Sequence, residues 1–288
     1  MDTDKVYDAI IEDNDEARWA YGTEFSDPLA GISDAIPSDV NSADFAAYCL
    51  MLGDDALVLS HRLQQWCGRA PELEEEVALA NIGLDLLGQA RLLLTRAGAA
   101  LGRSEDDLAF ARDPGEFRNV QLVEVENGDF AASTVRLLIF STWRLALLTE
   151  LTGSRDPMLA AIAAKGIKEV AYHRDYAIRW ALRLGDGTPQ SHRRMRTGLA
   201  RTWPLLRELF GAHPVEARLA RAGIAVDPAA LREECVSVLG TVVSEAGLQP
   251  MAVPPYRLAG RAGEHTPALT SLLAEMQSVA RANPGATW

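Results

Sequence analysis

Three polar side chains recur at a fixed spacing in the otherwise apolar stretch ALANIGLDLLGQAR, residues 78–91. Asn81, Asp85 and Gln89 stand four residues apart, so on a helix they stack along one face. The rest of the stretch is apolar on nearly every side, which favours burial. A buried carboxylate must be neutralised, because an isolated charge is too costly to desolvate. The pattern predicts a polar stripe inside a helical core, with a cation beside Asp85.

A second apolar stretch, DPMLAAIAAKGIKEVAYHRDYAIRWALRLG, carries a matching stripe. Lys165, Glu169 and His173 stand four residues apart, and Lys168 lies in the adjacent row. We therefore expect Lys165 or Lys168 to form the ion pair with Asp85. Removing one partner of a buried pair costs about 3–5 kcal/mol, so the hypothesis predicts a large loss of stability in Asp85→Ala.

A carboxylate-bridged diiron site would require other residues. In four-helix proteins of that class, two helices each supply a Glu and the other two each supply a Glu-x-x-His pair. No histidine of this chain has Glu or Asp three residues before it; that position holds Val58, Val170, Pro189, Phe210 and Ala262 in turn. The alternative is an altered metal site that would make the chain an oxidoreductase in its own right. Its candidate ligands are Asp55, Asp85, Glu150, Glu169 and His173.

Helix signals predict the elements that position these stripes. Four long helices are expected at 43–66, 71–97, 129–151 and 157–184, from capping residues, prolines at first turns and closing glycines. Ser42 is the expected cap of the first. The polar segment 99–128 has few helix signals and is expected to be a long connection. These features predict an all-α fold, a ferritin-like four-helix bundle with a long crossover connection.

Additional C-terminal helices should pack around the bundle. One is expected after Ser191, with a kink at Pro204. Two more begin at Asp227-Pro228 and Thr266-Pro267 and are expected to end near Gly240 and Asn283. The intervening segment 247–265 has no helical period and should be extended.

Acidic residues are concentrated at the N-terminus. Residues 1–44 contain 12 acids and two bases, whereas residues 45–288 contain 28 acids and 26 bases. We therefore expect an acidic N-terminal extension, 1–41, that is loose or lies on a partner, followed by one ferritin-like helical domain, 42–288. The absence of a basic face argues against nucleic-acid binding.

Three cysteines, Cys49, Cys67 and Cys235, are widely spaced and odd in number, which favours a reducing compartment. The N-terminal sequence lacks the basic and apolar regions of a signal peptide. The most apolar stretch, 137–151, is interrupted by Arg144 and is shorter than a membrane span. We expect a cytoplasmic protein without membrane contact.

The segments 52–91, 154–173 and 223–228 closely resemble the family of C subunits of ring 1,2-phenylacetyl-CoA epoxidase, and the likeness extends over residues 45–288. The resemblance implies a ferritin-like, non-catalytic structural subunit of a multicomponent monooxygenase in phenylacetate catabolism. It also implies pairing with a catalytic diiron subunit, and a complex completed by small subunits and a reductase. The cofactor would then be the partner's diiron centre, with none in this chain.

The resemblance also implies a degenerate diiron site. Placed on the Glu-x-x-His pattern, Leu86 and Gln89 occupy one ligand pair, and Val170 and His173 occupy the other, so only His173 would survive as a ligand. The implied vestigial site comprises Asp85, Leu86, Gln89, Lys168, Glu169, Val170 and His173.

Contact with phenylacetyl-CoA is a further expectation. The loop RDPGEFRN, 112–119, sets an aromatic ring beside arginines, which could meet adenine and phosphates. Its candidate residues are Glu116, Phe117, Arg118 and Asn119, and Arg218 is another. The alternative is an ordinary surface loop. Candidate interface residues are Trp66, Trp143 and Trp180, with core packing as their alternative role.

Overall fold

The computed structural model describes residues 29–284 and 286. Within that part of the chain all regular elements are helical, which confirms the all-α prediction. Residues 1–28 of the predicted acidic extension lie outside the described residues. The chain divides into a short unit, Met1–Gly31, and a main unit, Ile32–Trp288. In the main unit Asp39 pairs with Arg155 at 3.1 Å, so this part of the predicted extension contacts the helical body.

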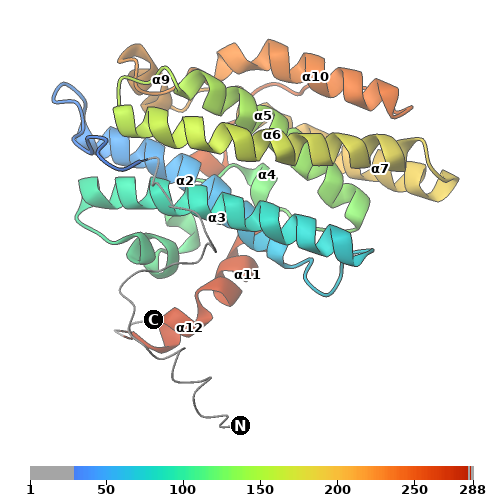
Figure 1. The fold of residues 1–288 in the computed structure, drawn as a ribbon, viewed down its shortest axis with the longest axis horizontal. Coiled ribbons are helices and arrows are strands. Elements are labelled where there is room, and N and C mark those ends of the chain that lie inside the picture. The colour runs from blue at the N-terminus through green and yellow to red at the C-terminus, as the bar shows by residue number, and fades with distance from the viewer. Residues whose placement is uncertain (1–28, 285, 287–288) are drawn as a thin grey trace, which may run out of the picture. The chain divides into compact units, whose positions relative to one another are not determined.

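Two helical hairpins form the bundle. α2 (Ser42–Gln64) packs along α3 (Leu73–Leu101), and α5 (Phe130–Leu151) packs along α6 (Pro157–Gly185). α3 and α6 run side by side and contact each other more sparingly (Figure 1). The chain crosses from one hairpin to the other between residues 102 and 129, which confirms the ferritin-like connectivity expected from the sequence.

The helix ends follow local capping chemistry. Asp129 and Asp156 cap α5 and α6 by accepting hydrogen bonds from backbone N–H groups three residues on. The expected cap of α2 was wrong by one residue, since Asn41 accepts the N–H of Asp44 at 3.0 Å. The predicted end of α3 at Ala97 was also wrong, because the helix continues to Leu101 and ends at Gly102, whose φ is +65°. Only glycine adopts that conformation freely.

The connection between the hairpins is more ordered than its sequence indicated. It contains a π-helical turn, η1 (Asp107–Ala111), a 3₁₀ turn, η2 (Pro114–Glu116), and one turn of α-helix, α4 (Gln121–Glu124). Tertiary partners, described below, supply the order that local propensity lacks.

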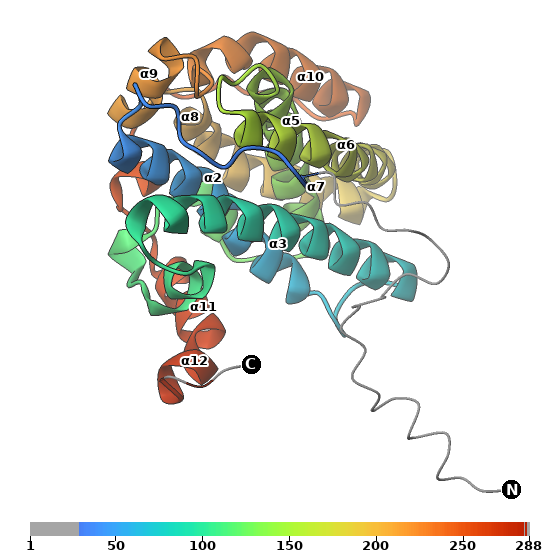
Figure 2. The same ribbon diagram turned by 60° about the vertical axis from the view of Figure 1, so that its left-hand side comes forward.

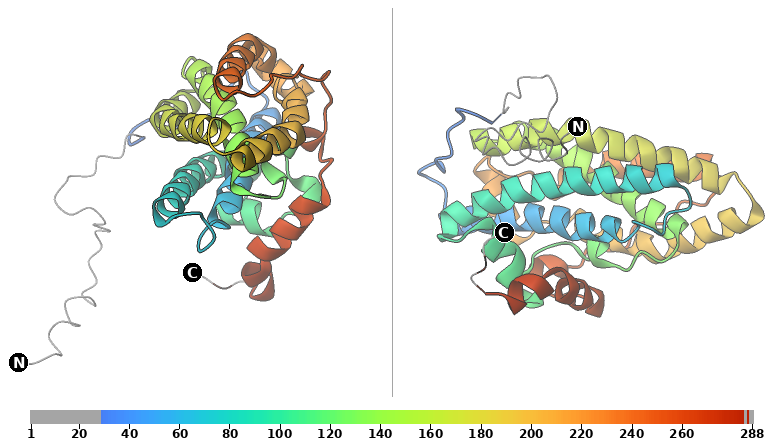
Figure 3. Two further views of the ribbon diagram at one scale, coloured as in Figure 1. Left: turned by 90° about the vertical axis from the view of Figure 1, so that its right-hand side faces the viewer. Right: turned by 60° about the horizontal axis from the view of Figure 1, so that its bottom comes forward.

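Two further helices flank α5 and α6 (Figures 2 and 3). α7 (Pro189–Thr202) packs on α5 and α6, as does α10 (Arg232–Glu245). The expected stop at Gly240 was wrong, because α10 runs five residues further and nothing crowds that glycine. The last predicted helix breaks at Gln277. The shorter elements are η3 (Trp203–Leu205), α8 (Leu206–Leu209), α9 (Pro214–Arg221), η4 (Pro228–Leu231), η5 (Gly260–Ala262), α11 (Pro267–Met276) and α12 (Ser278–Ala282).

Among the described helices, α3 and α5 are long and apolar enough to cross a membrane by length and composition alone. The apolar stretch 137–151 lies within the longer helix α5, so its shortness does not by itself exclude a span. Burial explains α5, since 89% of its most apolar window lies inside the molecule. The corresponding share for α3 is 44%, so this helix shows much of its apolar surface outside the fold.

Candidate functional site

A buried arginine lies at the centre of the bundle. Arg144 of α5 has none of its surface exposed, and its Nε and Nη2 atoms donate to Oε1 of Gln89 on α3 at 3.4 and 3.3 Å. Gln89 in turn donates from Nε2 to Oε2 of Glu169 on α6, at 3.0 Å. The amide thus joins a cation to a carboxylate through three hydrogen bonds. Burial lowers the pKa of Arg144 to about 10, although the nearby carboxylate of Asp55 opposes that shift.

The second link between α3 and α6 joins Asp85 to His173. His173 Nε2 lies 2.9 Å from Asp85 Oδ2; the histidine side chain is 1% exposed and the carboxylate 39%. The expectation that a lysine pairs with Asp85 was wrong, because Lys165 and Lys168 both point to solvent. The expected stripe is buried only at one end. Because Asp85 is partly exposed, its carboxylate can bind solvent as well as His173.

The residues in the other expected ligand places are apolar and closed off. Leu86 and Val170 have no exposed surface and supply no ligand atom. A Cβ at Gly166 would lie 2.9 Å from Leu148 Cδ1 and 3.4 Å from the Gln89 amide, so α6 packs closely against this network. No three His, Cys, Asp or Glu side chains of the described chain are grouped as they would be to hold a metal ion.

The acids of α2 have partners of their own. Asp54 forms a bidentate pair with Arg112, and its Oδ2 also accepts the N–H of Arg118 at 2.8 Å. Asp55 pairs with Arg261, with Nη2 to Oδ2 at 2.7 Å, and accepts the N–H of Val120 at 2.8 Å. Both acids are fully buried. They tie the crossover connection and the η5 turn to the bundle.

These pairs bear on the alternative metal site. Asp55 would have to leave Arg261 to bind a metal, and Glu150 lies exposed near the end of α5. Of the five proposed ligands, the structure brings together only Asp85 with His173, and places Glu169 on Gln89.

The loop expected to meet CoA has mostly internal partners. Phe117 is fully buried beneath the Arg112 guanidinium, 4.1 Å from its ring centroid, and Asn119 is fully buried and donates to Glu124 Oε2 at 3.1 Å. Neither can stack on or bind a ligand in solvent. Glu116 is exposed and closes the η2 turn on Asp113 N.

The two remaining candidate arginines are partly accessible. Arg118 is half-buried and donates to the carbonyls of Gly115 and Phe117, at 2.7 and 2.6 Å. Arg218 is 49% exposed and forms a bidentate pair with Asp44 at 2.6 and 2.7 Å. The structure leaves CoA contact at these positions a prediction.

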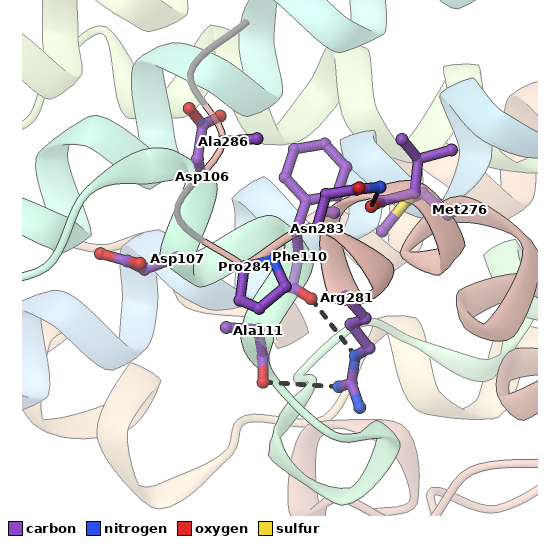
Figure 4. Close-up of a pocket in the computed structure, with 11 residues that line it drawn as sticks. Asp106, Asp107, Phe110, Ala111, Met276, Arg281, Asn283, Pro284 and Ala286 are labelled. Carbon is purple, nitrogen blue, oxygen red and sulfur yellow. Dashed lines mark hydrogen bonds between the residues drawn. The ribbon is translucent and has the colours of Figure 1, made fainter.

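A surface pocket of about 860 Å³ lies between η1 and α12 (Figure 4). Phe110, Met276 and Val279 give it apolar walls, and Asp106 lies at its edge. The guanidinium of Arg281 is occupied, because it donates to the carbonyls of Phe110 and Ala111 at 3.4 Å and to other acceptors of the same loop. With acids present and its arginine engaged, the pocket is poorly suited to CoA phosphates.

The outer face of α3 exposes a row of apolar side chains. Leu73, Val77 and Leu84 are 71%, 52% and 57% exposed, and spacings of four and seven residues place them on one helical face. Leu87 continues the row, and Tyr172 of α6 is 52% exposed. We call these five side chains the α3–α6 apolar face. Clustered exposed apolar residues of this kind mark interaction sites.

Two of the three tryptophans proposed for an interface lie in the core. Trp66 and Trp143 are buried, which favours their alternative role in core packing. Trp180 is half-buried, and its Nε1 donates to Glu75 Oε2 at 2.7 Å, beside the Tyr176 hydroxyl at 2.6 Å.

Sequence reasoning missed the role of Arg144 and the pairing of Asp54 with Arg112. The signals were present, since an arginine interrupts the apolar run 137–151 and two adjacent acids interrupt the apolar helix 42–64. A charged side chain in an apolar helix needs a buried partner. Which residue supplies that partner depends on segments distant in sequence.

Two comparisons with known proteins fit this arrangement. The family described as Phenylacetic acid catabolic protein matches residues 33–288. The C subunit of the 1,2-phenylacetyl-CoA epoxidase of Escherichia coli (strain K12) is 47% identical over 243 residues, which are 84% of this chain and 98% of that protein. The first 32 residues of this chain lie outside the family match.

Proposed function

Because the chain belongs to the phenylacetic acid catabolic protein family, we propose that it is a non-catalytic, supporting subunit of a phenylacetyl-CoA epoxidase. In this role it binds no metal and pairs with a catalytic diiron subunit, which carries the epoxidation. The small subunits and the reductase bind to that pair.

The observation that carries the proposal is the Arg144 guanidinium, which donates to Gln89 in the middle of the bundle. Resemblance to diiron bundles puts Gln89 in a ligand place. A fixed positive charge beside that place repels divalent iron, and the amide that would have to bind iron is held by Arg144 and Glu169. The neighbouring positions hold Leu86 and Val170, which offer no donor atoms. The residues do not fit a diiron centre.

The α3–α6 apolar face supports the pairing. Hydrophobic side chains exposed on a long helix favour a second helical surface over water, and an obligate interface of this kind buries on the order of 2,000 Å² or more. A helical subunit with a similar pair of long helices would cover the face along the first half of α3.

Metal analysis of the purified full-length chain, alone and after co-expression with the catalytic subunit, tests the first half of the proposal. We expect less than about 0.1 iron or manganese per chain alone, and iron in the complex in proportion to the catalytic subunit. Stoichiometric metal in the isolated chain would establish the alternative, a metal-binding oxidoreductase.

Pull-down of the catalytic subunit tests the second half. Leu84→Lys and Leu87→Lys should weaken capture at least tenfold, because each places a desolvated charge in the interface. Val279→Lys is the matched control, since Val279 is 57% exposed on α12, away from the face. Equal capture by all three variants would remove this face from the proposal.

A further inference from the structure

A small pocket between α5 and α7 contains a buried arginine that no carboxylate of residues 29–284 neutralises. The pocket has a volume of about 40 Å³, and its polar lining consists of Glu126, Arg136, Arg201 and Thr202. Arg136 comes from the second turn of α5, and Arg201 and Thr202 come from the end of α7.

In the described part of the chain, Arg136 has only neutral hydrogen-bond acceptors. Its side chain donates from Nη1 to the Val125 carbonyl at 2.6 Å and from Nη2 to Oδ1 of Asn127, while Nε has no partner among the described residues. Only 1% of its surface is exposed, and no described acid lies within ion-pairing distance of it. By contrast, the buried arginines Arg112 and Arg261 each bind a carboxylate.

Further positive charge lies close by. Arg62 is buried and donates to the carbonyls of Glu124 and Ala268, and its charge adds to burial in lowering the pKa of Arg136 to about 9. Arg201 lies over the turn before α5, because a Cβ added to Gly128 would lie 3.1 Å from the Nη1 atom of Arg201. Arg62 and Arg201 thus add two positive charges near Arg136.

Close backbone packing fixes the walls of the pocket. A Cβ at Gly198 of α7 would lie 2.9 Å from the Cα of Ala132 on α5, so the two helices touch at that point. One turn further along α7, Arg201 and Thr202 are thereby held against the start of α5. The pocket is therefore pre-formed.

We infer that this pocket binds a small monovalent anion, a halide or the carboxylate of a small acid, between Arg136 and Arg201. A buried guanidinium without a counter-charge is costly, and an anion that supplies the opposite charge removes much of that cost. A water needs about 10–15 Å³ of such a cavity, so 40 Å³ admits one small anion and excludes a nucleotide. Glu126, which is exposed, stands at the pocket as a competing negative charge.

Bromide is a suitable probe, because its anomalous scattering identifies it in a crystal. Crystals of the full-length chain soaked in sodium bromide should show an anomalous peak within hydrogen-bond distance of the Arg136 guanidinium. In solution, Tm is measured in bromide and in gluconate at the same ionic strength, because gluconate is too large for the pocket. Replacing gluconate by bromide should raise the Tm of the wild-type chain by about 2–4 °C more than that of Arg201→Gln. Arg201 is exposed, so this variant should fold.

Matched variants decide between an anion and its competitors. Arg196→Gln removes an exposed arginine of the same helix outside the pocket and should respond to bromide as the wild type does. Glu126→Gln should respond at least as strongly. The proposal is overturned if no anomalous peak appears. It is also overturned if a peak appears but bromide changes the Tm of the wild type and of Arg201→Gln equally, which would indicate an adventitious ion only. A bromide response confined to Glu126→Gln would also overturn it, because Glu126 itself would then be the occupant.

Discussion

Oε1 of Gln89 lies 3.3 Å from Nη2 of Arg144, and this pair joins α3 to α5 where both helices are buried. The amide of Gln89 continues to Glu169 on α6, so one side chain connects three of the four bundle helices. In an apolar core such a connection specifies the register of the helices, because any shift would leave a charged group unpaired.

The first prediction concerns Gln89→Leu. The leucine fills a similar volume but leaves the donors of Arg144 and the Glu169 carboxylate without this partner, so the free energy of unfolding should fall by about 2–3 kcal/mol. Chemical denaturation measures the change. Asn81→Leu, on the exposed end of the same stripe, should shift stability by no more than about 0.5 kcal/mol.

A double-mutant cycle with Arg144→Met makes this prediction specific. The double variant should lose less stability than the sum of the single variants, with a coupling of about 1 kcal/mol or more, since the second substitution removes the donors that the first leaves unpaired. Strict additivity would show that the two side chains do not interact.

The second prediction compares a buried ion pair with an exposed one. Asp55→Ala strands the buried Arg261 charge, and its free energy of unfolding should be about 3–5 kcal/mol lower. Asp44→Ala breaks the pair with the half-exposed Arg218 and should cost about 1 kcal/mol or less. Urea titration of both variants measures the difference. Similar losses of unfolding free energy in the two variants would contradict our assignment of Asp55 and Arg261 as a buried ion pair.

The third prediction concerns pH and Glu216, whose side chain is buried at the start of α9. Burial raises the pKa of Glu216 above its ordinary value of 4.5, and Arg261 only partly opposes that shift. A raised folded-state pKa means that the folded chain holds the proton more tightly, so this stabilisation is complete below pH 4.5 and is lost as pH rises through the folded value.

Glu216→Gln removes that titration while leaving an oxygen to accept the His213 N–H, as Glu216 Oε2 does at 2.8 Å. The stability of the wild type relative to the variant should therefore decline as pH rises above 4.5. Denaturation at several pH values measures the difference, and a difference that does not change with pH would refute the prediction.

The fourth prediction uses two helical glycines in different surroundings. A Cβ at Gly240 of α10 would meet nothing within 4 Å, so Gly240→Ala should raise stability by about 0.5–1 kcal/mol through helix propensity. Gly166→Ala would place its Cβ 2.9 Å from Leu148 and against Gln89, so it should lower stability by about 1–3 kcal/mol. Thermal unfolding of both variants measures the contrast, and equal gains would mean that α6 does not pack closely there.

The sequence by itself determined the helices and their order. Periodic apolar residues and capping signals act within one or two turns, so four long helices and a crossover between them could be predicted from local pattern, with errors of a few residues at ends such as Gly102. The same pattern predicted polar stripes through Gln89, Glu169 and His173.

Only the tertiary structure decided which charges meet. Asp85 contacts His173 and not a lysine, because the register of α3 against α6 turns Lys165 and Lys168 outward. Asp54 and Asp55 find arginines 58 and 206 residues away, and Phe117 turns inward under one of them. Partner choice in a core depends on packing between distant segments, which the periodicity of any one helix does not contain.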